Sequence, residues 1–238
     1  MSGWRSVLAA LLVCAFGCFA ALSASAGEWR RFECGYAAFE VPADWLEASE
    51  ETKAAIAARG WRWAEARNLE LTPTDRKVRH LVMFDRAGVS RGMIRFVSSP
   101  NPDIVEVLDL VQTDDEFFKE YAAWASETWP QYVPNYLSWE DVTRTVVGGR
   151  RAVKVAYLRR SQFDQKAVWR VRSYMLPFNR ERYLQLTLSQ DVDAPPEVGE
   201  ALERVLSTFM LRRRPAPGAL LNNDFNGQSE KEDTNERD

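Results

Sequence analysis

Four segments of alternating apolar and polar residues between positions 138 and 190 constrain the fold most strongly. Gly148-Gly149 separates the first two segments, and a two-glycine connection is typical of a tight hairpin. In the last segment Leu184, Leu186 and Leu188 alternate with polar side chains, as expected of a strand whose faces differ in environment. These segments predict a four-strand antiparallel meander.

Further patterns extend this sheet and add helices around it. Residues 30–41 predict two strands folded at Gly35, and residues 78–97 predict a hairpin with one buried side. We expect an α+β domain with a mainly antiparallel sheet of about six to eight strands and helices packed on it. The predicted helices are one after the N-cap Ser49, one from the Thr113–Glu116 capping box to Pro130, and one after Pro195-Pro196.

An apolar leader precedes this domain. Residues 7–22 carry no charge, and as a helix they would reach about 24 Å, less than the roughly 30 Å hydrocarbon layer of a bilayer. Ala24-Ser25-Ala26 supplies the small residues that a signal peptidase requires, so residues 1–26 predict a secretory signal and a periplasmic protein. An uncleaved membrane anchor is the alternative. Lipid attachment at Cys18 is disfavoured, because an alanine stands three residues before it.

The remaining composition limits the domain count and the partners. Residues 27–211 are long enough for one domain, and Arg212–Asp238 predict a disordered tail because they have little apolar periodicity. That tail is also a possible partner-binding strip. The formal net charge of −3 argues against nucleic-acid binding. Signal cleavage would leave Cys34 as a lone cysteine, either a buried apolar side chain or a reactive thiol.

Three short stretches together resemble a known family. They are FEVPADW at 39–45, GGRRAVKVAYLRR at 148–160 and VLSTFML at 205–211. They resemble the entry segment, central hairpin and closing helix of PsbP-like and DcrB-like domains. The resemblance implies an α/β sandwich with an antiparallel sheet and non-enzymatic roles in photosystems, envelope uptake, phage adsorption or chaperone-like adaptation. No functional residue of the family can be carried over, and envelope members often have a lipid-attachment cysteine that Cys18 matches poorly.

The inventory of reactive residues disfavours most kinds of catalysis. Beyond the leader the chain has one histidine and one cysteine, too few for an ordinary zinc or copper site, and it has no phosphate-binding glycine loop. We therefore predict no catalytic residue, no metal and no cofactor. His80 is interpreted as a packed core residue, with a catalytic base or a Cys34–His80 pair as alternatives. In the acidic segment 103–127, Asp114 and Asp115 are assigned to a helix N-terminus, and weak cation binding is the alternative.

Two groups of residues are candidate binding sites. Lys154, Arg170 and Arg172 point away from apolar neighbours on adjacent strands, so one sheet face brings these three cations together to bind an anionic partner. The alternatives are a solvated face or cross-strand pairing with Glu140 or Asp141. The second group is a possible aromatic pocket between sheet and helix, lined by Trp124, Trp139 and Trp169.

These observations favour an exported periplasmic accessory or binding protein that acts through surface contacts without catalysis. Its predicted partner is an envelope protein or an anionic ligand. A small-ligand carrier using the aromatic pocket is the first alternative. A carboxylate-based hydrolase is the second, and it is disfavoured because Glu140 and Asp141 on a flat strand point to opposite faces.

Overall fold

The computed structural model describes residues 28–66, 80–86, 90–161 and 164–212. The predicted leader and residues 213–238 of the predicted tail lie outside the described residues. The strands are β1 Trp29–Cys34, β2 Ala37–Pro42, β3 Leu46–Glu47, β4 His80–Phe84, β5 Gly92–Pro100, β6 Tyr136–Val147, β7 Arg150–Arg160, β8 Val168–Pro177, β9 Arg182–Asp191 and β10 Met210–Leu211. The helices are α2 Glu50–Glu65, α4 Pro102–Thr113, α5 Asp115–Tyr132 and α6 Pro196–Thr208.

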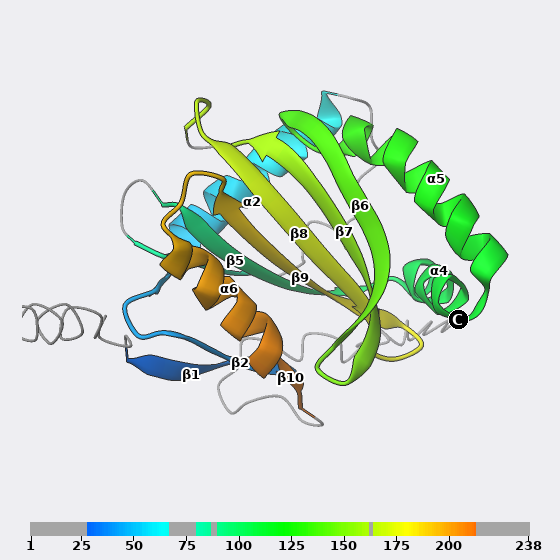
Figure 1. Ribbon diagram of the computed structural model, residues 1–238, viewed down its shortest axis with the longest axis horizontal. Coiled ribbons are helices and arrows are strands. Elements are labelled where there is room, and N and C mark those ends of the chain that lie inside the picture. The colour runs from blue at the N-terminus through cyan, green and yellow to red at the C-terminus, as the bar shows by residue number, and fades with distance from the viewer. Residues whose placement is uncertain (1–27, 67–79, 87–89, 162–163, 213–238) are drawn as a thin grey trace, which may run out of the picture.

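The strands form two antiparallel sheets (Figure 1). The larger has seven strands in the order β3-β4-β5-β9-β8-β7-β6, and the smaller has three in the order β1-β2-β10. Helix α6 packs on β2 of the small sheet and on β5 and β9 of the large one. The predicted α+β class is therefore confirmed, with a second small sheet that the sequence patterns did not reveal.

The predicted meander is confirmed as β6 to β9. Gly148 and Gly149 connect β6 to β7 with φ angles of 56° and 73°, a left-handed region that glycine enters without steric cost. Strand β9 then pairs with β5 along the whole length of β5. The meander and the earlier β4–β5 hairpin thereby become one continuous sheet.

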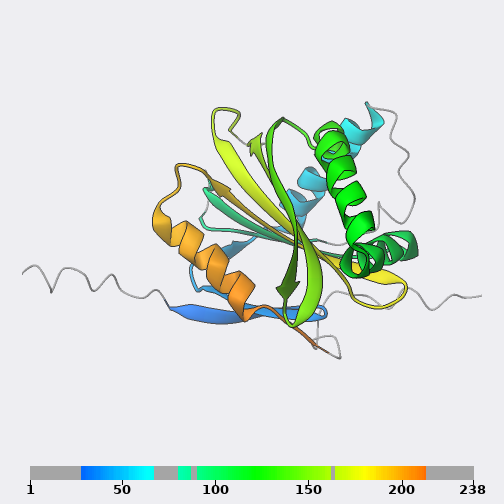
Figure 2. The ribbon, with the colours of Figure 1, turned by 45° about the vertical axis from the view of Figure 1, so that its right-hand side comes forward.

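Helices cover both faces of the large sheet (Figure 2). Leu184, Leu186 and Leu188 of β9 are fully buried in a cluster with Leu202 of α6. On the opposite face, Val155 and its neighbours form a second cluster under α4 and α5. Because the sheet separates two apolar layers, each strand in the middle of it is buried on both sides.

The β4–β5 hairpin shows the consequence of this double covering. Met83 and Ile94 belong to the cluster under α6. Val82 and Met93 point the other way and pack with Trp169 and the partly buried Ile56 of α2. The prediction of one buried side is therefore wrong, because α6 covers one face of the hairpin and α2 covers the other.

The segment between β5 and β6 holds two helices where one was predicted. Asn101 begins α4, accepting a 3.0 Å hydrogen bond from the Ile104 amide. Thr113 ends α4 and is not a cap. Asp114 caps α5 by accepting bonds of 2.8 Å and 3.0 Å from the Glu116 and Phe117 amides, as an acidic residue at a helix N-terminus should.

Other boundaries also shift from the predicted ones. Ser49 caps α2 as predicted, accepting a 3.2 Å bond from the Thr52 amide, but α2 passes Gly60 to end at Glu65. Helix α5 continues past Pro130 and ends at Tyr132. It tolerates this proline because a proline in the last turn removes few helical hydrogen bonds. Within the described part of the chain, no helix combines the length and apolarity needed to cross a bilayer.

Arg212, the first residue of the predicted tail, contacts the small sheet. Its amide donates a 2.8 Å hydrogen bond to the Tyr36 carbonyl oxygen, and its side chain forms an ion pair with Glu33 of β1.

Candidate functional site

The three predicted cations lie on the same face of the large sheet. Lys154 on β7 is directly opposite Tyr174 on β8. Arg170 and Arg172 share the face of Tyr174 because they are separated from it by even numbers of residues along β8. This is the face on which α6 packs, but Figure 1 shows β6, β7 and β8 beside α6 and not beneath it.

Each of these cations is paired with a carboxylate. The Lys154 Nζ donates to Asp141 Oδ2 at 2.9 Å, and the Arg170 Nε donates to Glu140 Oε1 at 2.8 Å. The third pair joins Arg172 to Glu203 of α6. We call this set the ion-paired face; its residues are Glu140, Asp141, Lys154, Arg170, Arg172 and Glu203. Three positive and three negative side chains balance, so the face is a charge mosaic and not a basic patch.

A β-bulge allows two successive acidic residues to join this face. The β6–β7 register shifts between Trp139 and Asp141. A bulge sets two residues opposite one, so neighbouring side chains no longer alternate strictly. Glu140 and Asp141 consequently both reach cations on one side of the sheet. The expectation that they point to opposite faces is wrong for this reason, although the cross-strand pairing considered above is present.

Tyr174 lies on the same face of the sheet as these ion pairs, directly opposite Lys154, and is buried. Burial raises the pKa of its phenol; Arg172 lowers it, and Glu203 and Asp141 raise it. The second oxygen of Asp141, Oδ1, is buried without a hydrogen-bond partner among the described residues. The face therefore combines charged donors and acceptors with one acceptor that is still unsatisfied.

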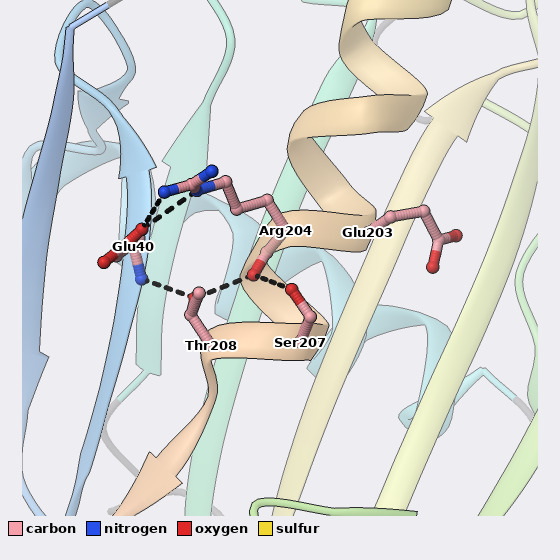
Figure 3. A pocket seen from close by; sticks show the side chains of 5 residues that line it. All are labelled: Glu40, Glu203, Arg204, Ser207 and Thr208. Carbon is pink, nitrogen blue, oxygen red and sulfur yellow. Dashed lines mark hydrogen bonds and ion pairs between the residues drawn. The ribbon is translucent and has the colours of Figure 1, made fainter.

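A shallow groove continues from the ion-paired face along α6 (Figure 3). It encloses about 590 Å³ and is lined by Glu40, Glu203, Arg204, Ser207 and Thr208. Arg204 donates to Glu40 Oε2 from Nη2 at 2.6 Å and from Nε at 2.9 Å, and its guanidinium lies 4.6 Å from the centre of the Trp29 ring. The Glu40 amide donates to Thr208 Oγ1 at 2.9 Å. These bonds fix the end of α6 to β2.

The three tryptophans of the predicted aromatic pocket have different surroundings. Trp139 is partly buried opposite Tyr157 of β7, and Trp169 is fully buried opposite Arg159 of the same strand. Both therefore lie on the face covered by α2, α4 and α5. Trp124 is 51% exposed on α5, where its ring is 5.7 Å from that of Tyr121. Trp139 and Trp169 thus lie on the two strands that flank β7, whereas Trp124 lies on α5 and is not part of this pair.

Cys34 and His80 lie on different sheets. Burial, with a smaller effect of Glu47, raises the pKa of the Cys34 thiol to about 11. The thiol is therefore protonated at neutral pH and a poor nucleophile. His80 is the first residue of β4 and pairs with Val97; its side chain lies outside what the structure describes. No group of three or more His, Cys, Asp or Glu side chains in the described ranges could hold a metal ion.

Several solved structures have a similar arrangement of elements at low sequence identity. The cyanobacterial PsbP (CyanoP) of Synechocystis sp. PCC 6803 is 11% identical, with a TM-score of 0.44 over 79% of this chain and 95% of its own. LpqN of Mycobacterium tuberculosis, described as involved in cell envelope biogenesis, is 12% identical, with a TM-score of 0.41 over 80% and 87%. A Bacteroides thetaiotaomicron protein is 9% identical, with a TM-score of 0.40, and this chain covers 48% of its length.

No family model matches the chain, and no curated protein matches its sequence.

Sequence reasoning missed the α6 side of the candidate site. Glu203 and Arg204 lie on the polar face of a helix and have no local signal of function. Their partners are distant: Glu40 is 164 residues from Arg204, and Arg172 is 31 residues from Glu203. Only the packing of α6 between the two sheets brings these side chains together.

Proposed function

We propose that this protein is an exported, non-catalytic binding protein that recognises a partner protein in the cell envelope through the ion-paired face and the adjoining groove. The observation that carries the proposal is the set of three ion pairs contributed by β6, β7, β8 and α6 on the part of the sheet beside α6. The apolar leader with its small residues supports export.

The energetics of exposed ion pairs suit such a surface. A solvent-exposed pair contributes roughly 0.2–1 kcal/mol to stability, so exchanging it for a pair with a partner costs the fold little. Arg170 and its partner Glu140 are 48% and 29% exposed, and both remain accessible. A partner that offers acidic side chains to Lys154, Arg170 and Arg172 gains charge-assisted hydrogen bonds, and the guanidinium forks make the recognition directional.

Reversing the three cations should abolish partner recovery. The variant carries Lys154→Glu, Arg170→Glu and Arg172→Glu, which sets like charges beside Asp141, Glu140 and Glu203. A matched control carries Arg150→Glu, Arg151→Glu and Arg180→Glu, three exposed positions with the same change in net charge. The chain without its leader is immobilised, incubated with envelope extract, and captured proteins are quantified by mass spectrometry.

We expect a specific partner to fall by at least ~10-fold with the first variant, equivalent to about 1.4 kcal/mol of binding free energy, and to persist with the control. Circular dichroism and a melting curve check that both variants are folded. Equal recovery by the wild type and the first variant would remove the ion-paired face from the proposal.

Export has its own test. The mass of the protein recovered from the periplasmic fraction should correspond to a chain that begins at Gly27. Small residues at positions 24 and 26 allow cleavage after Ala26. A protein found in the cytosol with Met1 retained would contradict export, whatever the outcome of the capture experiment.

A further inference from the structure

The face of the large sheet opposite to the ion-paired face has a polar centre. Arg95 of β5 is directly opposite Thr187 of β9, which is opposite Ser173 of β8. Gln185 Nε2 donates to Ser173 Oγ at 2.7 Å, and Ser173 and Thr187 hydroxyls are 3.4 Å apart. This polar row separates the apolar cluster under α4 and α5 from the one beside α2.

Arg159 of β7 is the second guanidinium on this face. It lies directly opposite Trp169 of β8 and two residues from Tyr157 on its own strand. The Nε of Arg159 is buried and has no hydrogen-bond partner among the described residues. Burial lowers the pKa of Arg159, and Tyr157 opposes that shift. Burial also lowers the pKa of Arg95. Tyr157 raises the pKa of Arg95, and the like charge of Arg159 lowers it.

Arg159 is partly buried, and a guanidinium whose Nε is removed from water is stabilised by a counter-charge. Arginine cannot release its proton under physiological conditions, and an isolated charge removed from water costs several kcal/mol. Two ionisable groups in the described ranges interact with Arg159: Tyr157, whose pKa is raised by burial and which is therefore neutral, and Arg95, which has the same charge as Arg159. Neither of them supplies a negative charge. Trp129 packs in the same cluster as Tyr157, and its indole N–H acts against burial by lowering the pKa of Tyr157.

We propose that Arg159, with Tyr157 and Arg95 beside it, binds an oxyanion, the carboxylate or phosphate group of a small ligand, on the α2–α5 side of the large sheet. The unsatisfied Nε belongs to the planar fork that engages two oxygens of such a group. Trp139 and Trp169, on the strands flanking β7, supply an aromatic border. This site is on the other face from the proposed protein-binding surface, so the two proposals are independent.

The test measures anion binding by the folded chain without its leader. Sodium phosphate and sodium dodecanoate, the latter below its micelle concentration, are each titrated against sodium chloride at constant ionic strength. Tryptophan emission is the readout, because Trp169 lies next to Arg159. Saturable binding of phosphate would show that a free oxyanion is enough for binding. Saturable binding of dodecanoate but not phosphate would show that the ligand must be an amphiphilic carboxylate. Either result supports the site.

Three variants separate binding from a structural role. Arg159→Met should weaken the anion by at least ~10-fold, whereas Arg151→Met, at an exposed position of the same strand, should bind like the wild type. In chloride alone Arg159→Met should melt at or above the wild-type temperature, because it removes a buried charge. Should this variant fail to fold, Arg159→Lys keeps the charge without the fork and should also bind more weakly. The site is refuted if neither anion saturates or if the Arg159 variants bind like the wild type.

Discussion

Replacing Leu202 with alanine is expected to lower the free energy of unfolding by about 3 kcal/mol. Leu202 is fully buried on α6, in the cluster that also contains Phe39 of β2 and Leu186 of β9. Truncation removes apolar contacts with both sheets and leaves a cavity that a helix held at both ends cannot close. The loss should therefore fall within the range of roughly 2–5 kcal/mol seen for buried leucines.

Urea unfolding followed by circular dichroism measures this effect, with an unchanged m-value showing that the transition still exposes the same surface. Ser207→Ala is the matched control, since Ser207 is exposed on the same helix and its change should stay within about 0.5 kcal/mol. A loss below about 1 kcal/mol for Leu202→Ala would contradict the role of α6 as the link between the sheets.

The elements that could be predicted are those defined by local periodicity. Alternation and two adjacent glycines identified β6 to β9, and the apolar spacing at Val198, Leu202 and Val205 identified α6. Both signals depend on residues close in sequence. The same holds for the helix N-terminus at Asp114, where the local chemistry was recognised although the capping residue was misplaced by one position.

What could not be predicted depends on contacts between distant residues. Alternation within β4 and β5 indicated two faces for each strand, but which of these faces are buried depends on α2 and α6, which lie elsewhere in the chain. The bulge in β6 likewise arises from its pairing with β7, and it turns Glu140 and Asp141 to the same side. Strand alternation alone places Arg170 and Arg172 on one face, whereas placing Lys154 with them also depends on the β7–β8 register. Their neutralisation by Glu203 needed the position of α6.

The two faces of the sheet differ in how their charges are satisfied. On the ion-paired face every predicted cation has a carboxylate within the chain, so a partner competes with existing pairs. On the opposite face the Arg159 Nε is buried without a partner among the described residues, so an anion would fill an existing deficit. The first arrangement suits reversible contact with a protein surface, and the second suits binding of an oxyanion.

Replacing Asp85 with asparagine is expected to destabilise the protein by about 2 kcal/mol at pH 7. Asp85 follows β4 and is 8% exposed. Its Oδ1 accepts hydrogen bonds from Ser90 Oγ at 2.6 Å, the Arg91 amide at 2.9 Å and the Gly92 amide at 3.1 Å. Its Oδ2 accepts from Arg86 Nε at 3.1 Å. An amide keeps one acceptor oxygen but loses the charge that strengthens all four bonds.

The effect of Asp85→Asn should depend on pH. Burial raises the pKa of Asp85, but the hydrogen bonds from Ser90, Arg91, Gly92 and Arg86 together lower it by more than burial raises it. The pKa in the folded protein therefore lies below the ordinary value of 3.8. On acidification the Asp85 carboxyl therefore takes up its proton first in the unfolded chain. The charged Asp85 stabilises the protein fully above its ordinary pKa. This stabilisation is lost as the pH falls through the pKa of Asp85 in the folded protein. Urea unfolding of wild type and variant at pH 7, 5, 4 and 3 should show their difference shrinking at the acid end. The other carboxylates contribute equally to the wild type and to Asp85→Asn, so their effects cancel in the difference between the two unfolding free energies. A difference that stays constant with pH would show that Asp85 stabilises the hairpin through packing and not through its charge.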